Sequence, residues 1–489
     1  MSSPQTRTLT RTQAWTLALA GLGSFMVVLD LFAITTALPR IHASLHASIG
    51  TLAWTVSGYT LSFAVLLVTA ATLGDRWGRR PVYAAGLALF AISSAACALA
   101  PDAATLLATR VVQGAGAAVI MPLALALLNT AFPPDRRGWA MGVYGSVTGL
   151  GTVLGPVLGG VLTQTLSWRW IFWINVPAGL LAAGAVLRVV ADSRGTRRPA
   201  DPLGLTLAVT SMTAIVWAVI RAATTGWGDR AVIGTLAVGL ATLAGLVAWQ
   251  RAARHPMIPL RLFGDRAFSA GNAAIFAQSA SLTAMVFFTA QFFQDAQGNG
   301  PLAAGSRMLP LGVVPLLAGS SSGALADRAR ARQLITTGLI VQGGGVAALA
   351  WLGTRQRAYV VLAGPLLLVA LGLTLALPAL TKSVVGSVAP ADIGIASGLF
   401  TTLRQLGGAF GVAIAASAFA SAGGYRTPVS VAAGYDRAMY LAATLALLGA
   451  LAVSLSARPA EPWSARPPRA RRSDRPAQAL PRRAPSRRA

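Results

Sequence analysis

A short charged segment interrupts the apolar sequence near the start of the chain: Leu73-Gly74-Asp75-Arg76-Trp77-Gly78-Arg79-Arg80-Pro81. It lies between two apolar runs, residues 50–73 and 82–100. At about 1.5 Å of helical rise per residue, each run is long enough to cross the ~30 Å hydrocarbon core of a bilayer. Backbone groups in lipid need partners within the chain, so such runs must be helical. The segment and its flanks therefore predict two membrane-spanning helices joined by a short charged loop.

The same pattern extends along the whole 489-residue chain. Apolar residue types make up 55% of the sequence and charged types only 11%, against roughly 25% charged in soluble domains. So few charges cannot cover several soluble domains, but they can cover one body that faces lipid. The sequence predicts an all-α polytopic membrane protein with a retained first span rather than a signal peptide. Fourteen spans are expected near residues 14–38, 50–73, 82–100, 103–131, 138–163, 169–190, 203–222, 231–250, 267–293, 302–325, 332–353, 358–382, 394–421 and 436–457.

The net charge of +26 could suggest nucleic-acid binding, but the placement of the basic residues argues against it. Of this excess, +8 lies in residues 458–489, an Arg/Pro-rich tail predicted to be disordered and close to anionic lipid, and most of the rest lies in alternate loops. The single cysteine and three histidines offer no metal cluster and no buried nucleophile–base pair. We therefore expect no metal site, no enzymatic activity and no nucleic-acid partner.

The distribution of arginine predicts the orientation in the membrane. If the N-terminus is cytoplasmic, the arginine-rich loops fall on the cytoplasmic side, as the positive-inside rule requires. These loops hold Arg76, Arg79 and Arg80; Arg136 and Arg137; Arg194, Arg197 and Arg198; Arg251, Arg254, Arg261 and Arg266; and Arg328, Arg330 and Arg332. Most loops on the other side hold one arginine. An even number of spans then places both termini in the cytoplasm, with the chain in the plasma (inner) membrane.

An internal repeat divides the chain into two halves. The segment 71–76 matches 323–328, and Gly138, Gly142, Gly151 and Gly155 match Gly394, Gly398, Gly407 and Gly411. Duplicated halves are a common transporter plan, with substrate held between them. We expect a cytoplasmic N-terminus (1–13), a six-helix bundle (14–190), two inserted helices (203–250), a second six-helix bundle (267–457) and the tail (458–489).

Two predicted spans contain residues that are unusual in lipid. The span 103–131 includes Arg110-Val111-Val112-Gln113-Gly114, and an arginine near the middle of a span must face a cavity or a partner. The span 138–163 includes Gly151-Thr152-Val153-Leu154-Gly155-Pro156-Val157-Leu158-Gly159-Gly160. Glycines four apart let helix backbones touch, and proline bends the helix. By themselves these features predict a polar partner for Arg110 and close packing of the 138–163 helix.

Together these motifs resemble those of the major facilitator superfamily. Residues 75–80 are similar to its loop 2–3 signature, residues 110–114 to its helix-4 motif, and residues 151–160 to its antiporter motif, which marks exporters. Further segments resemble landmarks of its fourteen-helix drug–proton antiporter family: 29–30, 37–39, 168–172, 174–177, 255–263 and 403–408. The resemblance spans residues ~14–457.

The resemblance implies a major facilitator fold of two six-helix halves plus two inserted helices. It implies a proton-coupled antiporter that exports a small organic molecule, such as a drug, antibiotic or secondary metabolite; the alternative is an importer or symporter of a small organic solute. The expected partners are that substrate, protons and membrane lipid. The expected driving force is the proton-motive force without a cofactor, and the expected working unit is a monomer.

The candidate site residues follow from the acids and from these motifs. Asp30 alone among the fourteen acids is placed well inside a predicted span, so we expect it to carry the proton, with Arg110 tuning its proton affinity. A structural ion pair is the alternative. Gln113, Trp54, Tyr59 and Gln291 are candidate cavity or substrate residues, although core packing would also explain them. The resemblance adds a cytoplasmic gating motif (Asp75, Arg76, Gly78, Arg79 and Arg80) and an antiporter motif (Gly151, Gly155, Pro156, Gly159 and Gly160).

A single proton-carrying acid limits the energy available per transport cycle. One proton crossing 100 mV releases ~2.3 kcal/mol, and one pH unit adds ~1.4 kcal/mol. Exchange of that proton for a monovalent cation cancels the electrical part. The count of acids therefore favours neutral or anionic substrates over lipophilic cations.

Overall fold

The computed structural model describes residues 9–194, 201–254, 256–318, 331–353, 355, 358–389 and 392–456, and it is helical throughout. The first part of the chain forms α1 (Arg11–Leu45), α2 (Ile49–Trp77), α3 (Arg79–Leu99), α4 (Ala103–Ala131), α5 (Pro134–Thr165), α6 (Trp170–Trp173) and α7 (Asn175–Val189). Then follow α8 (Pro202–Thr225) and α9 (Arg230–Ala252). The last part forms η1 (Leu260–Gly264), α10 (Arg266–Gln291), η2 (Phe292–Ala296), α11 (Pro301–Arg307), α13 (Ala331–Gly353), α14 (Tyr359–Gly386), α15 (Ile393–Ala422) and α16 (Pro428–Leu455).

The membrane spans agree with the sequence prediction. Within the described residues, fourteen helical segments are long and apolar enough to cross a membrane, and each overlaps one predicted apolar segment. The expected all-α polytopic fold is confirmed. Four predictions concern residues outside the described ranges: residues 1–8, the second Asp-Arg motif at 327–328, His255 and the tail 458–489.

Polar caps in the loops decide where several helices begin. The Thr10 side chain and Gln13 form a capping box at the start of α1. The aspartates Asp102, Asp201, Asp229 and Asp265 each accept a backbone N–H at the start of α4, α8, α9 and α10. Such caps satisfy N–H groups that have no partner within the helix. Four of the few acids in this chain are therefore explained by helix capping.

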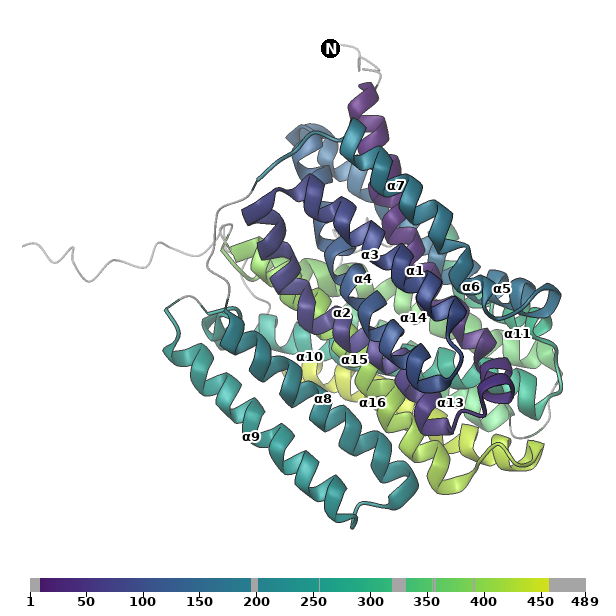
Figure 1. The fold of residues 1–489 in the computed structure, drawn as a ribbon. Helices are drawn as coiled ribbons and strands as arrows, with labels where there is room; N and C mark the ends of the chain where they lie inside the picture. The colour runs from purple at the N-terminus through teal and green to yellow at the C-terminus, as the bar shows by residue number, and fades with distance from the viewer. Residues whose placement is uncertain are drawn as a thin grey trace, which may run out of the picture.

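Helices α1 to α7 pack as one group, with α1 against α5 and α4 between α2 and α3. Helices α10 to α16 form a second group, in which α10 lies against α15 and α16, and α13 against α14. Helix α8 contacts both α2 and α15, whereas α9 packs on α8 at the edge of the molecule (Figure 1). The inserted pair therefore lies beside both groups and not between them.

One boundary differs from the sequence prediction in a way that matters for the site. Asp295 was expected just past the end of the ninth span, but the helix continues through a π-helical turn, Phe292–Ala296. Asp295 consequently lies within the candidate span that ends at Ala296. Hydrophobicity alone could not detect this extension, because Gln294 and Asp295 are polar while the backbone remains helical.

Candidate functional site

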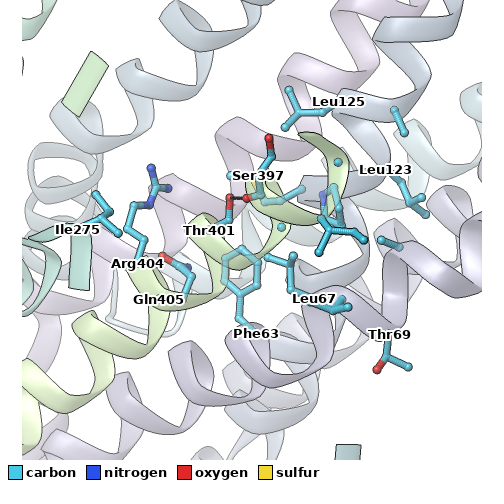
Figure 2. Close-up of a pocket in the computed structure, with 18 of the residues that line it drawn as sticks. Phe63, Leu67, Thr69, Leu123, Leu125, Ile275, Ser397, Thr401, Arg404 and Gln405 are labelled. Carbon is cyan, nitrogen blue, oxygen red and sulfur yellow. Dashed lines mark hydrogen bonds between the residues drawn. The ribbon is translucent and has the colours of Figure 1, made fainter. Parts of the chain in front are cut away.

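A cavity of about 1440 Å³ lies between the two groups of helices. Side chains of α1, α2, α4 and α5 line one wall, and side chains of α10, α14 and α15 line the other. Figure 2 shows part of this lining, with Phe63 and Leu67 from the first group and Thr401, Arg404 and Gln405 from the second. The volume exceeds the roughly 300–1,000 Å³ of most small-molecule sites, so an organic molecule could enter together with water.

The cavity reaches the surface at one end of the bundle. Its lining there includes charged residues that we call the mouth residues: Asp75, Arg79, Asp201, Arg254, Arg261 and Asp392. Arg254 is exposed, and Asp75 and Arg79 belong to the charged loop that the arginine distribution assigns to the cytoplasm. With that orientation, the conformation is open to the inside.

At the other end, contacts between the two groups close the cavity. The Gln294 side chain donates a hydrogen bond to the carbonyl of Thr36 at 2.9 Å, and the backbone N–H of Leu302 donates to Gln164 Oε1 at 3.1 Å. Phe288, Phe292 and Phe293 join the same buried cluster as Leu29, Phe32 and Ile34. Access is therefore blocked on this side by apolar packing between α1 and α10.

The predicted antiporter motif lies in this closed region. A side chain at Gly155 would come within 2.7 Å of Phe32 Cβ and 3.1 Å of the Leu29 carbonyl, and one at Gly159 would overlap the Ala33 carbonyl. On the opposite face of α5, a side chain at Gly160 would lie 2.5 Å from the Pro301 carbonyl. The glycines thus bring α5 into backbone contact with α1 and with α11 of the second group. Helix α5 joins the two halves on the closed side.

Asp30 and Arg110 form an ion pair between α1 and α4, and both side chains are fully buried. The Gln113 amide donates to Asp30 Oδ1 at 3.0 Å, and its oxygen accepts from Arg110 Nη1 at 2.6 Å. Arg110 Nε also donates to the Thr55 carbonyl of α2 at 3.2 Å. The structure therefore places Asp30 beside Arg110, as the sequence predicted, and adds Gln113 to the same network.

Two further residues complete the network, and the sequence analysis did not assign them to the site. Asn175 Nδ2 donates to Asp30 Oδ1 at 3.2 Å from the start of α7, and Ser94 of α3 accepts from Gln113 Nε2 at 2.7 Å. Both are buried polar residues inside apolar segments, and Asn175 also lies in the segment 174–177 that resembles a family landmark. The network consequently links α1, α2, α3, α4 and α7.

The ion pair does not line the cavity in this conformation. Tyr59 covers the guanidinium of Arg110, whose Cζ lies 4.2 Å from the ring centroid, and the Tyr59 hydroxyl donates to the Val27 carbonyl at 3.3 Å. The proposed wall residues Gln113, Trp54, Tyr59 and Gln291 are also absent from the described cavity lining. Gln291 bonds instead to the Phe287 carbonyl, one turn earlier in α10. These side chains pack within the helix groups, which is the alternative that the sequence left open.

The predicted gating motif forms a compact loop at the mouth. Arg79 pairs with Asp75 at 2.8 Å, whereas Arg76 is exposed. Gly78 has a φ of 107°, which strains any other residue, and a Cβ there would lie 2.8 Å from Asp192 Oδ2. Asp192, which the sequence analysis did not single out, accepts the backbone N–H of Arg80 at 3.1 Å and so caps α3. The motif holds α2 and α3 in a tight junction next to the cavity.

Arg404 on α15 is a site residue whose role the sequence did not identify. It lines the cavity together with Gln405 and lies within the span Ile393–Ala422. Among the residues that the structure describes, no acid forms an ion pair with it. An arginine within a span costs at least ~2.5–3.5 kcal/mol by insertion scales, and the usual explanation is a functional pathway.

Comparisons with known proteins agree with this architecture. A sequence model of the Major Facilitator Superfamily matches residues 20–412. The tetracenomycin C resistance and export protein of Streptomyces glaucescens is 35% identical, with 83% of this chain and 76% of the relative covered. The cephamycin export protein CmcT of Amycolatopsis lactamdurans is 37% identical, with 83% and 85% covered. The multidrug resistance protein Stp of Mycobacterium tuberculosis is 35% identical, with 84% and 77% covered.

Solved structures share the fold at much lower sequence identity. A bacterial homologue of the human lysosomal transporter Spinster, in an inward-facing and unoccupied conformation, superposes with a TM-score of 0.68 at 16% identity, covering 92% of this chain and 98% of the other. A D-xylose–proton symporter superposes with a TM-score of 0.64 at 16% identity, covering 90% and 97%. These similarities concern the architecture alone.

Proposed function

Because this chain belongs to the major facilitator superfamily, we propose that it exports a small organic molecule in exchange for protons. The observation that carries this proposal is the set of relatives at 35% identity or more, which cover over four fifths of this chain and are export or resistance proteins for antibiotics and other drugs. The chain is a multi-pass membrane transporter. Its proposed substrates are drugs, antibiotics or secondary metabolites, its proposed location is the plasma membrane with both termini inside, and its proposed working unit is one chain.

The central cavity is the proposed route of the substrate. In the described conformation it is open at the mouth residues and closed by α1–α10 packing, which suits loading from the cytoplasm. Its lining is mostly apolar, with Phe63, Leu67 and Met121 on one wall and Leu282 and Leu377 on the other. Apolar walls release ordered water when they cover an organic ring system, so they favour amphipathic substrates without demanding one shape.

The proposed proton site is Asp30. In this conformation Asp30 pairs with Arg110, which requires an ionised carboxylate and corresponds to the state after proton release. Protonation of Asp30 would remove the ion pair and leave the buried Arg110 guanidinium without its counter-ion, a change worth several kcal/mol. The cost would be relieved by rearrangement of the helices that share the network.

The position of Asp30 links the proposed proton transfer to the closed gate. Its neighbour Leu29 packs against two glycines of α5: a Cβ at Gly151 would lie 3.0 Å from the Leu29 backbone nitrogen, and one at Gly155 would lie 3.1 Å from the Leu29 carbonyl. A shift of α1 that follows protonation would therefore act directly on the α1–α5 contact, and α5 in turn contacts α11 of the second half. We propose that this backbone contact transmits the protonation state to the gate, with the proton-motive force as the sole driving force and no cofactor.

The direction of transport separates export from the alternative of import or symport. The full chain should be expressed in a bacterial strain whose own drug exporters are deleted, and the cells challenged with a panel of toxic organic compounds. Export predicts higher tolerance and lower cell accumulation for at least one compound, with accumulation restored by a protonophore. Accumulation that rises with expression and falls with the protonophore would instead identify an importer.

A further inference from the structure

The charges that line the cavity are distributed unevenly. The lining includes three aspartates, and all three are mouth residues that already have partners within the chain. Asp75 pairs with Arg79 at 2.8 Å, and Asp392 pairs with Arg261 at 2.6 Å. Asp201 accepts hydrogen bonds from Trp249 at 2.8 Å and from Gln250 at 2.7 Å. Two of the aspartates described at the mouth are therefore held in ion pairs, and the third is held by hydrogen bonds to neutral groups.

Arg404 differs from the mouth residues in its depth. It lies on α15 past the mouth residue Asp392, three turns into the span, and it lines the same cavity. No aspartate or glutamate in the described part of the chain pairs with it. Its titratable neighbour is Tyr144 of α5, from the opposite helix group, and the Tyr144 hydroxyl is bonded to Ser24 Oγ at 2.7 Å. Within the described ranges, Arg404 thus contributes a positive charge to the cavity that no acid neutralises.

The contrast with Arg110 shows what a purely structural arginine needs in this fold. Arg110 is covered by Tyr59, paired with Asp30 and bonded to the Thr55 carbonyl and to Gln113. Arg404 has no comparable set of partners in the described residues, and Figure 2 shows its guanidinium extending away from the α15 backbone. Buried charges are paired or bind a ligand. Arg404 is half-buried and faces the cavity, so its guanidinium is placed to bind an anionic group that enters there.

We propose that Arg404 binds an anionic group of the transported molecule, so that the preferred substrates are amphipathic organic anions such as carboxylates. This inference deepens the proposed export function and rests on it for the identity of the site. The planar guanidinium matches the two oxygens of a carboxylate, and the low polarity of the surrounding walls strengthens that bond. Gln405, next in sequence, lines the same cavity and offers an amide to the substrate. The apolar lining then covers the rest of the molecule.

The direction of the proton-motive force agrees with an anionic substrate. Export of one anion removes a negative charge from the cell, and entry of one proton adds a positive charge to it. A membrane potential that is negative inside therefore drives both halves of the exchange, whereas it would oppose the export of a cation.

The test uses three probes of one shape and different charge: 9-anthracenecarboxylate, its neutral carboxamide and 9-anthracenemethylammonium. Binding of each probe is measured by fluorescence on the full chain in lipid nanodiscs, with empty nanodiscs subtracted. We expect the carboxylate to bind about tenfold more tightly than the ammonium, which corresponds to about 1.4 kcal/mol. Arg404→Gln should abolish the preference, and Arg404→Lys should keep part of it, because lysine retains the charge but not the two-pronged geometry.

Arg230→Gln is the matched control, because it removes the same charge from an exposed position at the start of α9, outside the cavity lining. It should keep the full carboxylate preference. Equal binding of the three probes by the unchanged chain, or an undiminished preference in a monodisperse Arg404→Gln protein, would overturn the inference. A preference that depends on Arg404 in a chain that fails the export assay would retain the anion site and reject the proposed function. Export by a chain that binds the three probes equally would retain the proposed function and reject the anion site.

Discussion

At the scale of single residues, the central feature is the buried carboxylate of Asp30, which accepts hydrogen bonds from three side chains. Asp30 accepts from Arg110, Gln113 and Asn175, which lie on α4 and α7. A carboxylate so held is stable while ionised, and its neutral form loses the charge-assisted bonds. The same arrangement could serve as a static ion pair, and only a change of protonation during transport distinguishes a coupling site from a structural one.

Asp30→Asn separates these roles. Asparagine keeps the size of the side chain but cannot release a proton. In proteoliposomes with a pH difference, we expect the variant to lose at least about 90% of proton-driven drug transport, as is usual when an essential proton carrier is removed. Asp229→Asn is the matched control, because Asp229 caps α9 at the surface and asparagine caps equally well. Full proton-driven transport by Asp30→Asn would show that this carboxylate is only structural.

At the scale of elements, backbone contacts between helices decide how the two halves meet. Helix α5 has glycines on two faces, one against α1 and the other against α11. Other glycines of the same helix have no such neighbours, and a Cβ at Gly142 would meet nothing within 4 Å. The helix therefore contains its own internal control for the effect of an added methyl group.

Gly159→Ala should separate α5 from α1, since the new methyl group would overlap the Ala33 carbonyl. We expect a loss of about 1–3 kcal/mol in stability, typical of overpacking, and a strong fall in transport because the closed gate no longer forms. Thermal unfolding in detergent and transport in proteoliposomes measure the two effects. Gly142→Ala should change neither, and an equal effect of both substitutions would mean that close packing at Gly159 is not the cause.

Asp201 connects the two inserted helices, since it caps α8 and also bonds to Trp249 and Gln250 at the end of α9. Partial burial acts to raise the pKa of Asp201, but these hydrogen bonds together lower it below the ordinary value. A lowered pKa stabilises the folded state above the usual aspartate pKa of ~3.9, and that contribution is lost as pH falls through the lower folded value.

Asp201→Asn tests this connection, because asparagine keeps the cap but not the charge. We expect the variant to be less stable by about 1 kcal/mol at pH 7, within the range for a hydrogen bond to a charged group at a partly exposed site. The difference from the unchanged chain should shrink as pH falls below ~4. Thermal unfolding curves of both proteins across this pH range provide the comparison. A gap that stays constant with pH would assign the effect to geometry instead of charge.

At the scale of the whole molecule, the conformation and the orientation are linked. The cavity opens only at the mouth residues among the described parts of the chain, and the positive-inside rule places that end in the cytoplasm. The native Cys97 is buried, so introduced cysteines can report access from each side without interference.

A cysteine at Ser279, in the cavity lining, should react with a membrane-impermeant maleimide in inside-out vesicles but not in right-side-out vesicles. A cysteine at Gly228, exposed in the loop between α8 and α9, should show the opposite pattern. Both reactions are measured by mass shift on gels. Reversal of both patterns would invert the predicted topology, and reversal at Ser279 alone would mean that the resting conformation opens to the outside.

Much of the fold was determined by the sequence itself, for a simple physical reason. Lipid forbids unpaired backbone groups, so each long apolar run had to be a helix, and the number of spans followed from their count. The glycine spacing in α5 also predicted close packing, because glycines four residues apart lie on the same face of an α-helix. In a membrane, the apolar segments of the sequence therefore predict the helical spans along the whole chain.

The tertiary structure decided which polar residues meet. Sequence identified Asp30, Arg110 and Gln113 as unusual, but Asn175 and Ser94 entered the network only through the packing of α7 and α3. Tyr59 and Gln113 were expected at the cavity wall and instead pack around the ion pair, while Arg404 faces the cavity without an acid in the described residues. Apolar periodicity is weak in helices that are buried on several sides. The direction in which a side chain points therefore depends on the rotation of its helix and on the neighbouring helices, and only the assembled bundle defines these.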